Sequence, residues 1–429
     1  MKENNETPHS MTISSCKEEI LKNLDQPRKL EALYLKDRSD FKRSFNLLYA
    51  DIQNNTTAQI WNERLNYKQE ESSKNNRNEI IYLIVACFIA GFIAKIPELI
   101  GMSEEVFYTR NIGFIVFPII ALYFVWKNEV HVNQILIIFS AFLCTVIYIN
   151  FLPKDSNSDT LTLACIHLPL ILWSVVGFSF VGNNVNSYNK RLDFLRFNGD
   201  LIVMAGLLFI ACAALTAVTF GLFGLIDLNI EYIFSKYLAV WGVPAIPIIA
   251  TYLVWNNPQL VNRVSPIVAR IFTPLVLVVL IAYLIAVIYS GKSPYNDREF
   301  LMIFNVLLFG VMAIILFSVA EISKNSKSRV GIVLLLALAS TTGIVNSIAL
   351  SAIIFRISEW GITPNRLAVV GANILILINL LLVTFRLFKS LKHRKEIENV
   401  EKSIAIFLPV YILWAILVTF IFPLLFGFK

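Results

Sequence analysis

From residue 79 onward, long apolar runs alternate with short polar connections. A helix that crosses the hydrocarbon core of a bilayer needs about 20 consecutive apolar residues, and these runs are of that length or close to it. The pattern predicts eleven membrane-spanning helices, at residues 79–96, 112–126, 134–152, 161–182, 201–226, 237–255, 270–290, 300–321, 330–355, 367–388 and 404–426. The second run is short at both ends, so its borders are the least well defined. The predicted fold class is an all-α polytopic membrane protein.

The first 78 residues have a different pattern. Phe41, Phe45 and Leu48 recur at helical spacing, as do Trp61 and Leu65, and polar segments separate these groups. We expect two to four amphipathic helices that form a small cytosolic domain over residues 1–70, followed by a polar hinge at residues 71–78. Two interpretations remain open. The helices pack on one another as a compact cap, or they dock a cytosolic protein partner.

Part of the membrane region is repeated along the chain. Residues 117–133, FPIIALYFVWKNEVHVN, recur 129 positions later as IPIIATYLVWNNPQLVN, with ten of seventeen positions identical. A third match at the same displacement relates LAVWG at 238–242 to LAVVG at 367–371. The related spans lie four spans apart and therefore run in the same direction. The sequence predicts parallel four-span repeats over residues 79–200, 201–329 and 330–429, the last of which lacks its fourth helix.

Proline and polar residues inside the spans are the candidate functional positions. Pro118 and Pro247 lie at matching places in two repeats, where a proline frees a backbone carbonyl. Such breaks either expose polar groups to a solute or fit curved helices together. Polar residues of the ninth and tenth spans, such as Asn346, Ser347 and Asn379, either line a hydrophilic pathway or pack helices closely. The pathway or helix-break candidates are Pro118, Pro247, Asn346, Ser347 and Asn379.

Composition and charge agree with a location in a membrane. Hydrophobic residues make up 56% of the chain, and charged residues only 16%. The net charge of +7 comes from basic residues in the N-terminal segment and the connections, where they meet anionic lipid, so we expect the bilayer as partner and no nucleic acid. With the N-terminus in the cytoplasm, 14 Lys and Arg residues fall in inside connections and 8 in outside segments. The C-terminus is then extracytoplasmic.

Motifs for catalysis or metal binding are missing from the sequence. The chain contains no HExxH, GxxxxGK[ST] or GxSxG pattern, and its five cysteines form no CxxC pair. The spans also contain very few titratable groups that could share a cavity. We therefore predict that the protein is not an enzyme and that it uses no cofactor or metal.

Three blocks of sequence carry a resemblance to a known family. They are the N-terminal KLEALYLKDRSDFKRSFNLLYADI with AQIWNERLNY, the stretch 265–321, and GITPNRLAVVGANI at 361–374. The chain resembles an uncharacterised family of polytopic bacterial inner-membrane proteins, a domain of unknown function seen often in Bacteroidetes. The resemblance implies a location in the bacterial inner membrane and a multi-pass topology. It implies no ligand.

The segment GITPNR at 361–366 is a further candidate, because the topology places it outside the cytoplasm. Thr363, Asn365 and Arg366 either form a functional extracytoplasmic motif or simply start the next helix.

Two functional hypotheses follow from these patterns. The parallel repeats, the matching prolines and the polar ninth span favour a small-solute transporter or channel-like protein. The alternative is a non-catalytic scaffold or regulatory membrane protein that recruits a cytosolic partner through residues 1–70.

Overall fold

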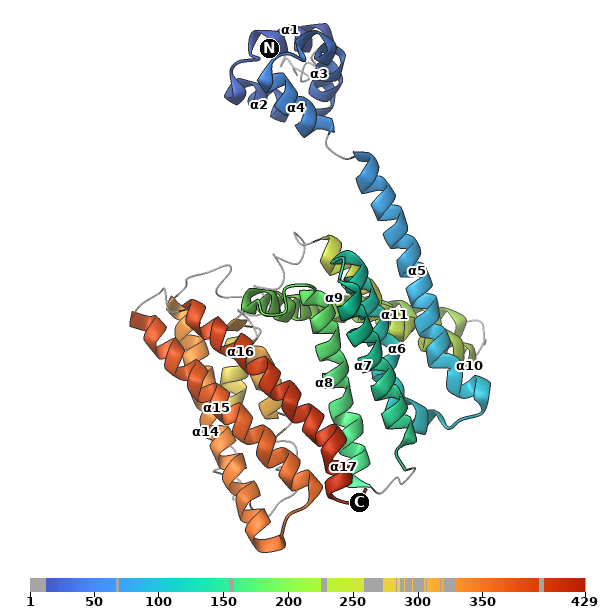
Figure 1. Ribbon diagram of the computed structural model, residues 1–429, viewed down its shortest axis with the longest axis vertical. Helices are drawn as coiled ribbons and strands as arrows, with labels where there is room; N and C mark the ends of the chain where they lie inside the picture. The colour runs from blue at the N-terminus through green and yellow to red at the C-terminus, as the bar shows by residue number, and fades with distance from the viewer. Residues whose placement is uncertain are drawn as a thin grey trace. The chain divides into compact units, whose positions relative to one another are not determined.

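The computed structural model describes most of the chain. The described residues are 13–66, 69–153, 158–224, 230–257, 273–282, 284–285, 289, 295, 305, 307–316, 318–319, 329–392 and 397–428. Every regular element among them is a helix (Figure 1). The chain divides into two compact units, Met1–Tyr82 and Leu83–Lys429. We describe each unit by itself.

The N-terminal unit contains four short helices with an aromatic core. They are α1 (Ile13–Lys22), α2 (Pro27–Lys36), α3 (Arg38–Ile52) and α4 (Thr56–Asn66). Phe41, Phe45 and Trp61 are almost fully buried, as their helical spacing predicts. Asp37 caps α3, because its carboxylate accepts hydrogen bonds from the backbone N–H groups of Ser39 and Asp40, each at 3.0 Å.

Helix α5 (Gln69–Ile100) contains the boundary between the two units. Residues 71–78, which we expected to form a polar hinge, lie inside this helix. The boundary drawn by contacts, between Tyr82 and Leu83, falls twelve residues after the predicted end of the cytosolic domain at residue 70.

The second unit is a bundle of helices, most of them longer than those of the N-terminal unit (Figure 1). They are α6 (Glu104–Lys127), α7 (Val132–Phe151), α8 (Asp159–Val181), α9 (Tyr188–Gly224), α10 (Glu231–Ile233), α11 (Val240–Asn256), α14 (Arg329–Trp360), α15 (Pro364–Lys392), α16 (Ile397–Ile416) and α17 (Phe422–Leu425). Two π-helical segments, η1 (Phe234–Ala239) and η3 (Leu417–Ile421), precede α11 and follow α16.

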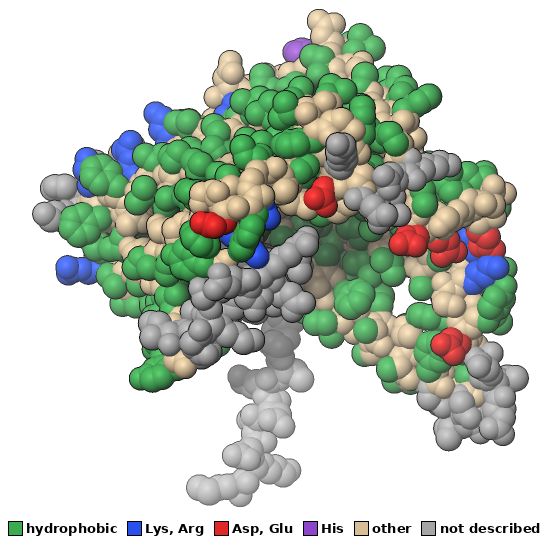
Figure 2. Space-filling view, turned by 90° about the horizontal axis from the view of Figure 1, so that it is seen from below, with side chains coloured by type: hydrophobic (Ala, Val, Ile, Leu, Met, Phe, Trp, Pro, Cys, Tyr) green, Lys and Arg blue, Asp and Glu red, His purple; other side chains and the backbone are tan. Residues whose placement is uncertain are grey.

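Nine helices among the described residues are long and apolar enough to cross a membrane. Each corresponds to one of the predicted spans. The predicted spans 270–290 and 300–321 are only partly covered by the described residues, which show short apolar helices there, at Thr273–Ala282 and Leu307–Leu316. Hydrophobic side chains also dominate the face shown in Figure 2. The all-α polytopic membrane fold is confirmed.

Two spans begin earlier than the hydrophobic pattern predicts. Helix α6 starts at Glu104 rather than near residue 112, and α9 starts at Tyr188 rather than near residue 201. At 1.5 Å per residue, the 37 residues of α9 extend about 55 Å, well beyond the hydrocarbon thickness. Arg110 and Arg191, which lie outside the predicted spans 112–126 and 201–226, are therefore in helices.

The first two copies of the repeated segment are neighbours in the structure. Helices α6 and α11 pack together, and the rings of Tyr123 and Phe124 lie 6.4 and 5.3 Å from the ring of Trp255. The glycines related by the 129-residue displacement have different surroundings. A Cβ atom at Gly371 would overlap the ring of Trp414, whereas one at Gly242 would meet no atom within 4 Å.

Candidate functional site: an apolar pocket with one arginine

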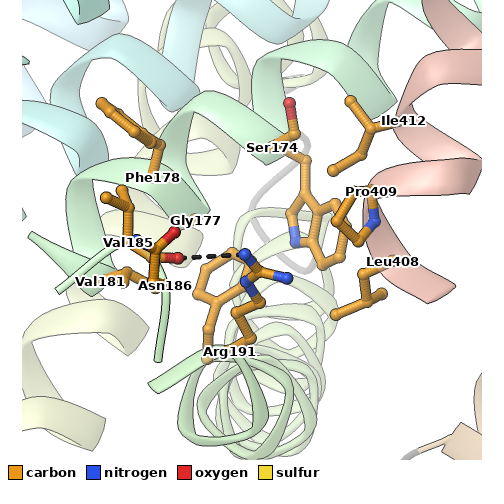
Figure 3. A pocket seen from close by; sticks show the side chains of 12 residues that line it. Ser174, Gly177, Phe178, Val181, Val185, Asn186, Arg191, Leu408, Pro409 and Ile412 are labelled. Carbon is orange, nitrogen blue, oxygen red and sulfur yellow. Dashed lines mark hydrogen bonds between the residues drawn. The ribbon is translucent and has the colours of Figure 1, made fainter. Parts of the chain in front are cut away.

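A pocket of about 280 Å³ lies between α8, the start of α9 and α16 (Figure 3). We call it the Arg191 pocket. Most of its lining is apolar, as expected for a small-molecule site. The lining residues are Trp173, Ser174, Gly177, Phe178, Val181, Val185, Asn186, Arg191, Phe194, Leu408, Pro409 and Ile412.

One edge of the pocket is formed where α8 ends. Gly182 ends the helix with φ +60°, a backbone conformation that favours glycine. The amide of Asn128 donates hydrogen bonds to two of the last carbonyls of α8, those of Ser179 at 3.3 Å and Phe180 at 2.9 Å. These groups would otherwise be left unpaired at the helix end. The residues after Gly182 then lead directly into α9.

Helix α9 forms the floor of the pocket. Figures 1 and 3 both show α9 nearly end-on and α8 from the side, so the two helices cross steeply. Gly177 permits the close approach, because a Cβ atom there would lie 2.8 Å from the ring of Phe194. The indole N–H of Trp173 donates to the side chain of Asn198 at 2.8 Å. These contacts fix the first turns of α9 against α8.

Arg191 extends from α9 into the middle of the pocket (Figure 3). Its Nη2 donates to the carbonyl of Val185 at 3.1 Å, and its Nη1 to the carbonyl of Ala405 at 3.5 Å. Ala405 lies four residues before Pro409 in α16. Since proline has no N–H, the carbonyl of Ala405 lacks its usual helical donor. The guanidinium of Arg191 therefore donates a hydrogen bond to the carbonyl that Pro409 leaves without its helical donor.

The charge of Arg191 is not neutralised within the described part of the chain. Its hydrogen bonds go to two backbone carbonyls, and no carboxylate there contacts it. The nearby acidic groups pair instead with Arg196, which lies 2.7 Å from Glu401 and 3.0 Å from Asp193. The pocket thus combines an apolar wall with one positive charge. In such surroundings a charge acts more strongly than in water.

The chemistry of this lining suits binding rather than catalysis. The hydroxyl of Ser174 donates to the carbonyl of Ile171 in its own helix, at 2.7 Å, and no general base stands beside it in the lining. Among the described residues, no three His, Cys, Asp or Glu side chains are grouped to hold a metal ion.

The polar residues predicted for a pathway are not brought together on one open face. Asn346 and Asn379 are fully buried. The amide of Asn346 donates to the carbonyl of Asn373 on α15, and that of Asn379 donates to the hydroxyl of Tyr411 on α16, each at 2.9 Å. Ser347 is exposed, and its hydroxyl donates to the carbonyl of Gly343 in its own helix. These contacts hold α14, α15 and α16 together.

The two repeat prolines lie inside continuous helices. Pro118 is within α6 and Pro247 within α11, and neither helix unwinds at its proline. Neither residue lines the Arg191 pocket.

The predicted extracytoplasmic motif forms the start of α15. The hydroxyl of Thr363 accepts a hydrogen bond from the backbone N–H of Arg366 at 3.3 Å. The side chain of Arg366 reaches back to the carbonyls of Trp360 and Gly361 at the end of α14, at 2.9 and 2.6 Å. Asn365 is partly exposed in the first turn. This geometry favours the helix-start interpretation.

Sequence reasoning missed the Arg191 pocket. Arg191 falls in the connection between the predicted spans 161–182 and 201–226, and Pro409 lies in the predicted span 404–426 without being among the candidate residues. One local signal was available, because a proline inside an apolar helix always leaves a carbonyl that needs another donor. Nothing in the sequence indicates that Arg191, more than 200 residues away, would be that donor.

Comparisons of the chain with protein-family models, with curated proteins and with solved structures found no match. The resemblance to a bacterial inner-membrane family therefore stays a prediction.

Proposed function

We propose that this protein is a small-solute transporter of the membrane and that the Arg191 pocket is its binding site. The observation that carries the proposal is the guanidinium of Arg191, which has no acidic partner in the described chain and lies in an otherwise apolar cavity. Small-molecule sites combine these same features, a concave apolar lining and a few polar anchors. The volume of about 280 Å³ lies at the lower end of such sites and suits a small solute.

Irregularities in α16 support movement around the pocket. Pro409 interrupts its hydrogen bonding at the pocket wall, and the π-helical segment η3 begins eight residues later. Prolines and π-helical turns are the usual places where helices bend. A wall that bends is what a site needs if it is to open first to one side of the membrane and then to the other.

The proposed setting is the bacterial inner membrane, with the N-terminus in the cytoplasm and the C-terminus outside. The distribution of Lys and Arg along the sequence supports this orientation. In it, the Arg191 pocket opens near the cytoplasmic end of α8. The Asn346 and Asn379 positions serve helix packing instead of a pathway.

Cysteine labelling from each side of the membrane tests transport without knowledge of the solute. The five free cysteines would first be replaced by serine or alanine, and Ser174→Cys introduced in the pocket wall. A membrane-impermeant thiol reagent would then be added to right-side-out and to inside-out vesicles. A transporter exposes its site alternately, so we expect labelling of Ser174→Cys in both preparations.

Asn184→Cys is the matched control, because Asn184 is exposed in the short connection before α9. It should react in one vesicle preparation only. If Ser174→Cys also reacts from a single side, the pocket binds without transporting, and the proposal is wrong.

A second candidate function is a membrane scaffold, and the N-terminal unit favours it. Residues 13–66 form their own core, yet Leu35, Leu47 and Ile60 are more than half exposed on the surface of α2, α3 and α4. Isolated exposed apolar residues are common, so this evidence is weaker than the pocket. Deletion of residues 1–68 separates the candidates. A transporter keeps its two-sided labelling of Ser174→Cys, whereas a scaffold loses its cellular function although the truncated protein still inserts.

A further inference from the structure

We infer that the ligand of the Arg191 pocket is a small monocarboxylate with an apolar body, such as a medium-chain or aromatic acid. The inference rests on the proposed function, because it names the class of solute that the same pocket takes. Three features carry it: the single charge, the free donors of the guanidinium and the shape of the apolar wall.

The charge in the pocket matches a monoanion. Arg191 supplies one positive charge, and the other guanidinium nearby, that of Arg196, already pairs with Glu401 and Asp193. A phosphate monoester carries a charge of about −1.5 to −2 near neutral pH and would remain partly uncompensated. A carboxylate carries one negative charge. Because burial of an unpaired charge is costly, the monoanion is the better match.

The guanidinium also has the right donors available. Arginine presents five N–H donors in a planar fork, of which two are directed at the carbonyls of Val185 and Ala405. One N–H on each Nη atom and the Nε–H remain. Two parallel N–H···O bonds are the preferred way in which arginine binds a carboxylate. The two backbone contacts hold the fork in place, so little side-chain freedom remains to be lost when a ligand binds.

The apolar wall fits the rest of such a molecule. Trp173, Phe178 and Phe194 contribute aromatic surface, and Leu408 and Ile412 face them from α16. A cavity of about 280 Å³ is at the lower end of the range of small-molecule sites. One short chain or ring fits that space, and a phospholipid with two long chains does not. An acid that occurs free in water, instead of a lipid of the bilayer, is the expected occupant.

Binding of decanoate to the full-length protein tests the inference. The protein would be held in nanodiscs of zwitterionic phosphatidylcholine, and labelled decanoate measured by equilibrium binding against protein-free nanodiscs. We expect saturable binding at one site. Arg191→Gln should weaken it about tenfold or more, since the variant loses hydrogen bonds to a charged group. Lys190→Gln removes the same charge from an exposed neighbour outside the pocket and should leave the affinity unchanged.

Further variants keep the test decisive if Arg191→Gln does not fold. Arg191→Lys retains the charge but loses the planar fork, so it should bind decanoate more weakly than the wild type while melting at a similar temperature. Ile412→Trp fills the cavity and leaves Arg191 in place, and it should also lose binding. The neutral analogue decanol should show no saturable binding.

Three results would overturn the inference. They are decanoate uptake that never saturates above the lipid background, tighter binding of decyl phosphate than of decanoate, and displacement of decanoate by phosphatidylglycerol added to the nanodiscs. The last result would assign the pocket to a membrane lipid.

Failure of the inference is distinguishable from failure of the proposed function. Two-sided labelling of Ser174→Cys without decanoate binding leaves transport standing and rejects the carboxylate. One-sided labelling with decanoate binding rejects transport and keeps the ligand.

Discussion

The two units of the chain place their polar residues in opposite ways. Between residues 16 and 65, the buried positions are apolar or aromatic except for Ser44. The unit from Leu83 onward buries Arg110 and several asparagines and exposes many of its large apolar residues. Water drives apolar groups together in the first unit. In the second, lipid is as apolar as the core, so close packing and hydrogen bonds between helices must hold the bundle together.

The largest expected effect comes from removal of a core ring in the N-terminal unit. Phe45 is fully buried and stacks between Phe41 and Tyr49, with ring centroids 6.0 and 6.2 Å away. Phe45→Ala should cost about 3–5 kcal/mol. For a unit of this size, that approaches the whole free energy of unfolding. Hydrogen exchange of the full-length protein should show α1 to α4 losing protection while α14 and α15 keep theirs.

The control for this variant is Leu47→Ala, at an exposed position of the same helix, which should change protection little. If α14 and α15 lose protection together with α1 to α4, the two units unfold as one, and the comparison fails.

In the second unit, the largest effect should come from a buried polar residue. Arg110 donates to the carbonyls of Ile149, Leu152 and Pro153, at 3.0, 2.9 and 2.8 Å, where α7 ends. Arg110→Met keeps much of the volume but leaves these carbonyls without their donor. Loss of one partner of a buried charged interaction costs about 3–5 kcal/mol, and we expect a loss near the lower value because no second charge is stranded.

Thermal aggregation in detergent measures this effect. Arg64→Met is the matched control in the other unit, because Arg64 pairs with Glu31 at the surface, where solvent weakens the interaction. It should change stability far less. Equal losses from the two variants would show that buried polar contacts are not what holds the second unit.

Close helix packing should give a smaller effect. A Cβ atom at Gly371 would overlap the ring of Trp414, which packs against α15 from α16. Gly371→Ala should therefore force the helices apart and cost about 1–3 kcal/mol, as overpacking usually does. Gly242→Ala is the matched control. Gly242 is related to Gly371 by the 129-residue displacement, and a methyl group added there meets no atom within 4 Å.

Since alanine favours helices by about 1 kcal/mol over glycine, Gly242→Ala should be neutral or stabilising in the same detergent melt. A similar loss at both positions would mean that overlap with Trp414 is not the cause of the loss at Gly371, and the prediction would be wrong.

The sequence predicted the spans well because a bilayer imposes a length that composition reveals directly. It placed the starts of α6 and α9 too late, since Arg110 and Arg191 interrupt the apolar runs that mark a span. These arginines are tolerated in helices because carbonyls from distant segments accept their N–H groups. The pattern of hydrophobic residues along the chain does not reveal which distant carbonyls accept these hydrogen bonds.

The polar residues of α14 show a related limit. Thr342 and Asn346 lie four residues apart and therefore share a helical face, and both are fully buried. Ser347, which the sequence analysis placed with Asn346 among the pathway candidates, is exposed. Adjacent residues lie about 100° apart on a helix, so the sequence could not decide which edge of the polar stripe faces a neighbour. The Arg191 pocket could not be predicted either. Its lining residues come from three helices, and the sequence does not show which helices pack together.

The smallest expected effect is a pH dependence confined to the N-terminal unit. Hydrogen bonds from the backbone N–H of Asp40 and the hydroxyl and N–H of Ser39 lower the pKa of Asp37 below its usual value of 3.8. The hydrogen bond from Arg64 lowers the pKa of Glu31 below 4.5 in the same way. Both carboxylates are charged in the folded state at pH 5, and both are exposed, so each contributes little.

A group whose pKa is lower in the folded state stabilises the fold above its unfolded pKa and loses that contribution as the pH falls through the folded value. Protection of the α1 to α4 amides against exchange should therefore decrease below about pH 4, once corrected for the intrinsic pH dependence of exchange, while that of α14 and α15 stays level. Asp37→Asn is the informative control. Asparagine caps a helix about as well as aspartate but does not titrate, so it should retain the α3 cap and flatten part of the acid response. An unchanged acid response in Asp37→Asn would assign the effect to other carboxylates, and an equal response in α14 and α15 would remove the contrast between the two units.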